Sequence, residues 1–497
     1  MESVLLINCM TVAAVSFIVI AYRFWMVKKE TRKLPSGTMG FPLIGETLEF
    51  MFYSYTTHPE AFMTKRRLKY GKVFKSHLFG NKTIVSTDAE INKFIMQGDM
   101  TVLVPDYPKS IKELMGESSI LFTHGSLHKK VHGLIGSFLK SPGLKSQVTA
   151  DMQHYIQMSM SCWKDDQIIP IQDASKEVIY KILVKGLVGM EAGKYMDLLR
   201  LHFHQFIAGL VSLPFKIPGS TFYKSLQASL IFQPLGSAGC SSPSLGIYAK
   251  KKLVQLMKSI IGERRRMRKN EKNMVPSPVK DMIDAFINDG SDELTDDHVV
   301  SNLINLMIPG NDSVPALIAL VVKNLSESPL ALRQIEEENM QLKKTKTDVG
   351  MKLVWRDYAS LSFTQDVITE SLRMGNIVTS VIRKAMTDIE IKGHFIPKGW
   401  SVMAYIRTVH YDDDFYEDPY KFNPWRWQNQ KKDMGRFSPF GGGQRLCPGV
   451  EFARLEASIY IHHLITSFSW VAQEDMHVSW PTPRMRKGMP VKIKRKI

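Results

Sequence analysis

The chain has 497 residues and 44% of them are hydrophobic, which is enough for a large core in one big domain or in several smaller ones. The four cysteines (Cys9, Cys162, Cys240 and Cys447) are scattered and include no Cys-x-x-Cys pair, which argues against a disulfide scaffold and indicates a reducing environment. The net charge is +17, but the basic residues are spread along the chain without a nucleic-acid signature. We therefore expect no nucleic-acid partner, whereas an anionic membrane surface or an acidic protein fits the charge.

The amino-terminal segment is uncharged and strongly apolar from Ser3 to Tyr22. About 20 such residues cross a bilayer as a helix. A cleaved signal peptide is the alternative, but it normally has positive charge ahead of its apolar run. Here the positive residues follow the run, which places the body of the protein on the cytosolic side. We predict a transmembrane anchor over residues 1–27 and a Pro/Gly-rich hinge over residues 28–47.

Beyond the hinge, residues 48–497 show mainly helical periodicity with short strand-like pieces. Strands are predicted at Val73–Leu78, Thr83–Ser86 and Val402–Tyr405, and helices at Leu253–Arg268, Asp297–Leu325, Phe363–Met374 and Gly449–Ser469. The stretch Ser229–Ala249, rich in small and turn-forming residues, is predicted to be a surface loop. The fold class is therefore mainly α with small β-sheets.

The helix around residue 310 contains helix-breaking residues in its middle. Pro309 and Pro315 each remove a backbone donor and free the carbonyl four residues earlier. Gly310 permits close approach to the backbone, and Asp312 and Ser313 place an acid and a hydroxyl beside it. One interpretation is a kinked core helix with a polar patch. The other is a groove that binds a small ligand and delivers protons to it.

Two further stretches carry charge in apolar surroundings. Glu370 and Arg373 are spaced i and i+3 within a helical pattern, so they can pair, although this spacing is common. Arg426 lies among aromatic residues in Pro419–Gln428. A buried Arg426 would need a carboxylate, and Glu370 is a candidate.

The stretch "FGGGQRLCPG", residues 440–449, contains the most specific pattern of the chain. Cys447 precedes a helix that begins near Gly449, and a helix amino terminus stabilises a thiolate. The three glycines leave room for a planar ligand, and Arg445 can pair with an anionic group of that ligand. Thiolate ligation of a haem iron is the chemistry that this spacing suggests.

These motifs, in this order, resemble those of the cytochrome P-450 haem-thiolate monooxygenases over the chain from the anchor to the carboxy terminus, apart from Ser229–Ala249. The resemblance implies a cytochrome P-450 fold with haem b, and Cys447 as the axial ligand of its iron. It implies a haem site whose other residues are Arg445, Arg383, His128, His132, Phe440, Gly441 and Gly449. His128 and His132 stand where the family usually carries a Trp and an Arg.

The same resemblance assigns two more groups. Gly310, Asp312 and Ser313 match the oxygen-activation groove, with Ser313 where the family usually has Thr. Glu370, Arg373 and Arg426 match a structural ion-pair network near the haem. The resemblance also implies O₂ as co-substrate and electrons from NADPH, delivered by a membrane-bound cytochrome reductase. It implies that a single transmembrane pass attaches the protein to the endoplasmic reticulum membrane, with the catalytic domain in the cytosol.

Several stretches, among them "VPDYPKSIKELMGESSIL" and "MIPGNDSVP", are similar to those of the brassinosteroid-pathway sterol hydroxylases. The subgroup most similar hydroxylates C-23 of 22-hydroxylated intermediates such as 3-epi-6-deoxocathasterone, with a 22-hydroxylase as the alternative. Candidate substrate contacts, for which core packing is the other interpretation, are Met307, Ile308, Ile377, Val378 and Thr379.

Two other classes stay open. A haem-thiolate enzyme that rearranges a peroxide would need no reductase, and Asp312 and Ser313 argue against it. The second is a sterol-binding protein whose catalysis is impaired by the extra residues Ser229–Ala249.

Overall fold

The computed structural model describes residues 34–42, 44–56, 58–98, 101–108, 111–112, 115–191, 193–210, 245–270, 279–290, 293–429, 435–478 and 484–496. The predicted anchor, residues 1–27, lies outside the described residues. So do residues 229–244 of the predicted loop and residues 28–33 and 43 of the predicted hinge.

Helices make up most of the described chain. In chain order they are α2 (Thr47–Ser54), α3 (Ala61–Tyr70), α4 (Ala89–Gln97), α6 (Gly125–Lys140), α7 (Pro142–Ser161), α8 (Ile171–Val188), α9 (Lys194–Leu210), α11 (Leu245–Asn270), α12 (Met282–Ile287), α13 (Asp296–Ser326), α14 (Pro329–Asp348), α15 (Trp355–Ala359), α16 (Ser362–Gly375), α17 (Ile406–His410), α18 (Arg426–Asn429) and α19 (Val450–Ser467), with a 3-10 turn, η1 (Gly443–Arg445).

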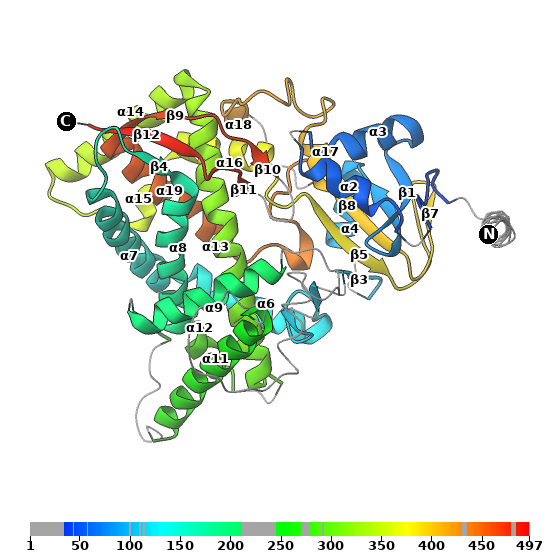
Figure 1. Cartoon of the computed structure of the whole chain (residues 1–497), viewed down its shortest axis with the longest axis horizontal. Helices are drawn as coiled ribbons and strands as arrows, with labels where there is room; N and C mark the ends of the chain where they lie inside the picture. Colours follow the sequence, from blue (N-terminus) through cyan, green and yellow to red (C-terminus); the bar gives the residue numbers. More distant parts are fainter. Residues whose placement is uncertain are drawn as a thin grey trace, which may run out of the picture.

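The strands form small sheets. They are β1 (Val73–Leu78), β2 (Asn81–Ser86), β3 (Leu103–Pro105), β4 (Ile168–Pro170), β5 (Ser380–Ala385), β6 (Ile389–Ile391), β7 (His394–Ile396), β8 (Ser401–Tyr405), β9 (Phe468–Ala472), β10 (His477–Val478), β11 (Arg484–Met485) and β12 (Pro490–Arg495). The largest sheet has the order β1-β2-β8-β5-β3, and within it only β2 and β8 pair in parallel. This sheet lies with α2, α3 and α4 at one end of the molecule, and the helical body occupies the other (Figure 1).

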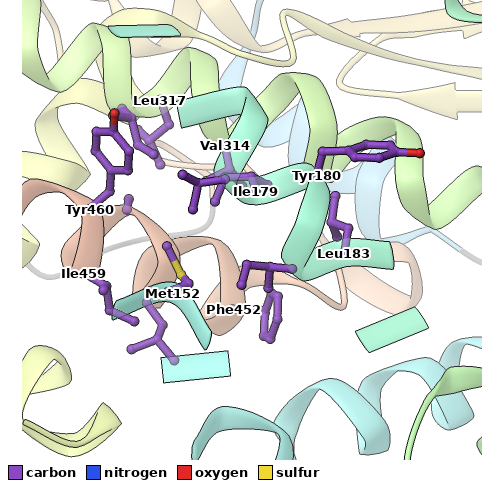
Figure 2. Close-up of a cluster of buried hydrophobic side chains, with 14 of the residues drawn as sticks. Met152, Ile179, Tyr180, Leu183, Val314, Leu317, Phe452, Ile459 and Tyr460 are labelled. Atoms are coloured by element: carbon purple, nitrogen blue, oxygen red, sulfur yellow. The ribbon is translucent and has the colours of Figure 1, made fainter. Parts of the chain in front are cut away.

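Helix α13 is the central element of the helical body. It begins at a cap in which the Thr295 side chain accepts a hydrogen bond from the backbone N–H of His298, and acidic residues occupy its first turn. Its side chains pack with those of α7, α8 and α19 around Met152, Ile179, Val314 and Ile459 (Figure 2). The helix is long and apolar enough to cross a membrane, but 71% of its most apolar window is buried inside the molecule.

The predicted fold class is confirmed for the described residues: they form a mainly helical body with small sheets. Each predicted helix and strand lies at or within a few residues of an observed one. One boundary was wrong. The last part of the predicted loop, residues 245–249, forms the first turn of α11. The last proline of that stretch is Pro243, so nothing after it removes a backbone donor.

Candidate active site

The loop that carries Cys447 folds tightly before α19. The backbone N–H of Cys447 donates to the carbonyl of Phe440 at 3.0 Å. Gly441 has φ +74°, a left-handed conformation that side chains rarely adopt, so glycine is required there. Burial raises the pKa of the Cys447 thiol, and a hydrogen bond from the backbone of Gly449 opposes the increase. A thiol in this position needs a bound cation to become a stable thiolate, which suits a metal ligand.

Not every glycine of the loop leaves space for a ligand. A Cβ atom on Gly443 would lie 2.7 Å from the carbonyl oxygen of Met96 and 2.8 Å from the Cα of Gln97. Gly443 is therefore required by packing against α4. This corrects the prediction that all three glycines clear a surface for a planar ligand.

A buried arginine, Arg383, and a partly buried one, Arg445, lie near this loop. The Arg445 guanidinium donates to the carbonyls of Ile120, at 3.1 Å, and Thr123, while its Nε has no partner among the described residues. Arg383 on β5 is 4% exposed and hydrogen-bonds Tyr107. Burial lowers the pKa of both guanidinium groups, and repulsion from Arg383 helps to lower that of Arg445 to about 10.

Helix α6 adds two histidines to the same cluster. His128 is buried, and its ring centroid lies 5.5 Å from that of His132. Burial, with the charges of Arg445, His132 and Arg383, lowers the pKa of His128 to about 3, so the ring is neutral. Nε2 of His132 lies 2.8 Å from the carbonyl oxygen of Leu446, the residue before the cysteine.

This cluster fits the haem that the motif implies. Within the described part of the chain neither Arg383 nor Arg445 forms an ion pair, so one buried and one partly buried cation lack an anion. Buried charge without a counter-charge is costly. A haem held by the Cys447 sulfur would bring two carboxylates, and the orphaned Nε of Arg445 is a donor for one of them.

The predicted oxygen-activation residues lie in the middle of α13. Asp312 Oδ1 forms an ion pair with Lys176 Nζ of α8 at 2.6 Å, and it also accepts from the amide of Asn311. Ser313 is partly exposed. The space above Gly310 is filled in this structure, because a Cβ there would meet the Leu183 side chain at 2.6 Å. Gly310 therefore permits the close packing of Leu183 of α8 against α13, and its place in an oxygen-activation groove stays a prediction.

The predicted ion-pair network is present and complete. Glu370 accepts from Arg373 at 2.8 and 3.0 Å, and Arg426 Nε donates to it at 3.0 Å. The indole of Trp427 and the backbone N–H of Asn423 also donate to this carboxylate. Glu370 and Arg373 have no exposed surface and Arg426 is 9% exposed, so two buried guanidinium groups share one buried carboxylate.

A histidine links this network to the cysteine loop. Arg373 Nη1 donates to the carbonyl of His410 at 2.7 Å, and the backbone N–H of Ser438 donates to Nε2 of the same residue at 3.1 Å. Nε2 must therefore be unprotonated, and Nδ1–H donates to Oδ1 of Asn376 at 2.7 Å. Burial, with the charges of Arg373 and Arg407, lowers the pKa of His410 to about 3, which keeps this tautomer neutral.

A family model described as "Cytochrome P450" matches residues 35–495. The chain belongs to the cytochrome P450 family. It is 52% identical over 462 residues to "Cytochrome P450 90D2" of Oryza sativa subsp. japonica, which covers 93% of this chain and 89% of that protein. It is 50% identical over 464 residues to the "3-epi-6-deoxocathasterone 23-monooxygenase CYP90D1" of Arabidopsis thaliana, covering 93% of this chain and 90% of that protein.

A second Arabidopsis thaliana protein, "3-epi-6-deoxocathasterone 23-monooxygenase CYP90C1", is 42% identical over 473 residues, with 94% of this chain and 85% of that protein covered. Among solved structures, the "Retinoic acid bound cyanobacterial CYP120A1" superposes with a TM-score of 0.78 at 23% identity, covering 94% of this chain and all of that one. At this level of identity the similarity supports only the fold of this cytochrome P450.

The candidate substrate contacts of this cytochrome P450 differ in their surroundings. Met307 is completely buried in the main core cluster, which favours the core-packing interpretation for this residue. Ile308 and Ile377 are partly buried against that cluster. Val378 is 44% exposed, and the Thr379 carbonyl accepts from the backbone N–H of Ile406 at the start of α17.

Sequence reasoning missed three residues that complete the site. Lys176, Tyr107 and His410 contact Asp312, Arg383 and the cysteine loop from distant parts of the chain. No local pattern marks Lys176 or Tyr107. His410 is separated from the predicted strand Val402–Tyr405 by Ile406–Val409, so no local pattern marks it either.

Proposed function

We propose that this cytochrome P450 is a haem-dependent monooxygenase that hydroxylates a sterol side chain in brassinosteroid biosynthesis, at C-23 of 22-hydroxylated intermediates. The observation that carries the proposal is the 50% identity, over nearly the whole chain, to a relative whose name states 23-monooxygenase activity on 3-epi-6-deoxocathasterone. The cysteine loop and the uncompensated cations beside it support the haem on which that activity depends.

In the proposed site the Cys447 sulfur would hold the iron of haem b, and Arg383, Arg445 and His128 would bind its carboxylates. When bound, the haem supplies the activation of O₂ and the insertion of one oxygen atom into an unactivated C–H bond. Asp312 and Ser313 relay protons to the site of oxygen activation beside α13. Lys176 holds the Asp312 carboxylate at 2.6 Å and so fixes the position of this group of the proton relay.

Electrons come from NADPH through a reductase that docks on the Cys447 side. An open cleft of about 960 Å³ lies there, and Cys447, Phe440, Lys140 and Arg454 are among its lining residues. Cationic side chains at the rim of this cleft suit an acidic partner surface. Residues 1–27 anchor the protein by a single pass in the endoplasmic reticulum membrane, with the catalytic domain in the cytosol.

The first experiment is the reduced, carbon-monoxide-bound difference spectrum of the full chain in microsomes. A thiolate-type Soret band is expected, and Cys447→Ala should abolish it. Two deletion variants, lacking residues 229–249 and residues 229–244, should be recorded in parallel. The second keeps the first turn of α11. A band in the deletion variants alone would identify the present chain as the catalytically impaired form.

The second experiment is turnover with NADPH, reductase and paired sterols. A 22-hydroxylated sterol should gain one oxygen at C-23, and product analysis separates this outcome from 22-hydroxylation of a 22-deoxy sterol. Turnover of a hydroperoxide without NADPH would instead support the rearranging class. Sterol binding without any turnover, in the presence of the thiolate band, would leave a non-catalytic binder.

A further inference from the structure

Helix α13 carries four asparagines that are at most 5% exposed: Asn302, Asn305, Asn311 and Asn324. The Nδ2 of Asn311 donates to Asp312 Oδ1 at 3.3 Å, and its Oδ1 has no partner among the described residues. The amide of Asn302 is fully used, because it accepts from the backbone N–H of Ile120 at 2.8 Å and donates to the carbonyls of His298 and Ser118. The amide of Asn324 donates to the hydroxyl of Ser371 at 3.0 Å. Asn305 differs, since neither its Nδ2 nor its Oδ1 has a partner among the described residues.

An amide buried in this way needs an explanation. Leaving a buried donor and a buried acceptor without partners is among the more costly defects of a folded protein. A third polar atom lies at the same place, because Pro309 has no N–H and the Asn305 carbonyl therefore loses its α-helical donor. Asn305 thus concentrates one donor group and two acceptors at one buried point of the helix.

The position of Asn305 points to the substrate. Asn302, one turn earlier on the same side of the helix, fixes α13 to the segment at Ile120, whose carbonyl also accepts from Arg445. Asp312 lies seven residues later, two turns along the same side. Asn305 therefore lies on α13 between Asn302 and Asp312. It is about 10 Å along the helix axis from Asp312.

We propose that the Asn305 amide binds a hydroxyl group of the sterol and selects substrates that carry it. This inference rests on the proposed function. A hydroxyl donates one hydrogen bond and accepts others, so it can receive the Nδ2–H of Asn305 and donate to its Oδ1 or carbonyl. A site built to bind a hydroxyl discriminates strongly against the analogue that lacks it, since the protein groups are then left unpaired.

The test uses the full-length haem-loaded protein and three sterols. One carries both a ring 3-hydroxyl and a side-chain 22-hydroxyl, one lacks the 22-hydroxyl, and one lacks the 3-hydroxyl. Dissociation constants are measured by the Soret shift for the wild type, for Asn305→Leu and for the matched control Asn324→Leu. Asn305→Leu should weaken binding of the dihydroxy sterol about tenfold and leave binding of one of the two deoxy sterols unchanged.

The deoxy sterol that is unaffected identifies the hydroxyl that Asn305 binds. Asn324→Leu should lower thermal stability without changing the ratio between the sterols, because its partner is Ser371. An equal loss of affinity for all three sterols in Asn305→Leu, or no loss for any, would overturn the assignment and leave a buried water as the partner of the amide. A wild type that forms the thiolate band but binds none of the sterols would overturn the proposed function, and this inference with it.

Discussion

Two buried groups of charges in this molecule differ in one respect, and the difference separates structure from function. In the Glu370 network both guanidinium groups pair with one shared carboxylate, which accepts additional hydrogen bonds from Trp427 and Asn423. In the cluster beside Cys447, Arg383 and Arg445 repel each other, and the Nε of Arg445 has no partner in the described chain. In the paired network the carboxylate offsets the desolvation cost of the buried guanidinium groups within the protein itself. The unpaired cations beside Cys447 keep that cost until an anionic ligand binds.

The largest expected effect lies in the complete network. Glu370→Gln removes the shared carboxylate and leaves two buried arginines uncompensated, so we expect a loss of about 3–5 kcal/mol in the free energy of unfolding. Chemical denaturation of the haem-free protein measures it. The control is Glu336→Gln, which breaks a partly exposed pair with Lys496 at 2.6 Å and should cost about 1 kcal/mol or less. Equal effects of the two substitutions would remove the distinction between the clusters.

In the incomplete cluster the matching substitution should act on the ligand. Arg383→Gln removes one of two repelling cations, so the haem-free protein should change in stability by less than about 1 kcal/mol. Its haem affinity, measured by transfer to apomyoglobin, should fall about tenfold because a partner for the haem carboxylates is lost. Lys384→Gln, which alters the exposed neighbouring residue of β5, is the control and should change neither quantity. A large loss of stability with unchanged haem affinity would make Arg383 a structural residue.

The two clusters also show what the sequence can predict. The spacing of Glu370 and Arg373 is local and led to the correct helix and ion pair. The glycine and cysteine pattern is also local and led to the helix α19 that follows it. The contacts that complete the site are not local: Lys176 reaches Asp312 across 136 residues, and Gly310 is explained by Leu183 of another helix. Periodicity identifies which face of a helix is buried, but it does not identify the neighbour that covers that face.

A third prediction concerns the histidine between the network and the cysteine loop. Because the pKa of His410 is lowered to about 3, the unfolded chain binds a proton between about pH 6.5 and pH 3 that the folded chain does not. Stability must therefore fall as the pH falls through this window, with a contribution from His410 of about 1.4 kcal/mol per pH unit. His410→Gln should reduce the slope of unfolding free energy against pH by that amount near pH 5.

Other buried histidines, including His128 and His462, have pKa values near 3 and keep part of the slope in this variant. An unchanged slope in His410→Gln would mean that the imidazole is already protonated in the fold, and the hydrogen bond from the Ser438 N–H to its Nε2 would then be excluded.

The smallest expected effect is at the ion pair between Lys176 and Asp312. Lys176→Met leaves Asp312 in place but without its ion pair, so sterol turnover should fall a few-fold while the thiolate band and sterol affinity stay unchanged. The same substitution in an Asp312→Asn background should have no further effect, because the lysine then has no carboxylate to hold. A few-fold loss that persists in the Asp312→Asn background would show that Lys176 acts through the packing of α8, and the positioning role would fail even though the ion pair exists.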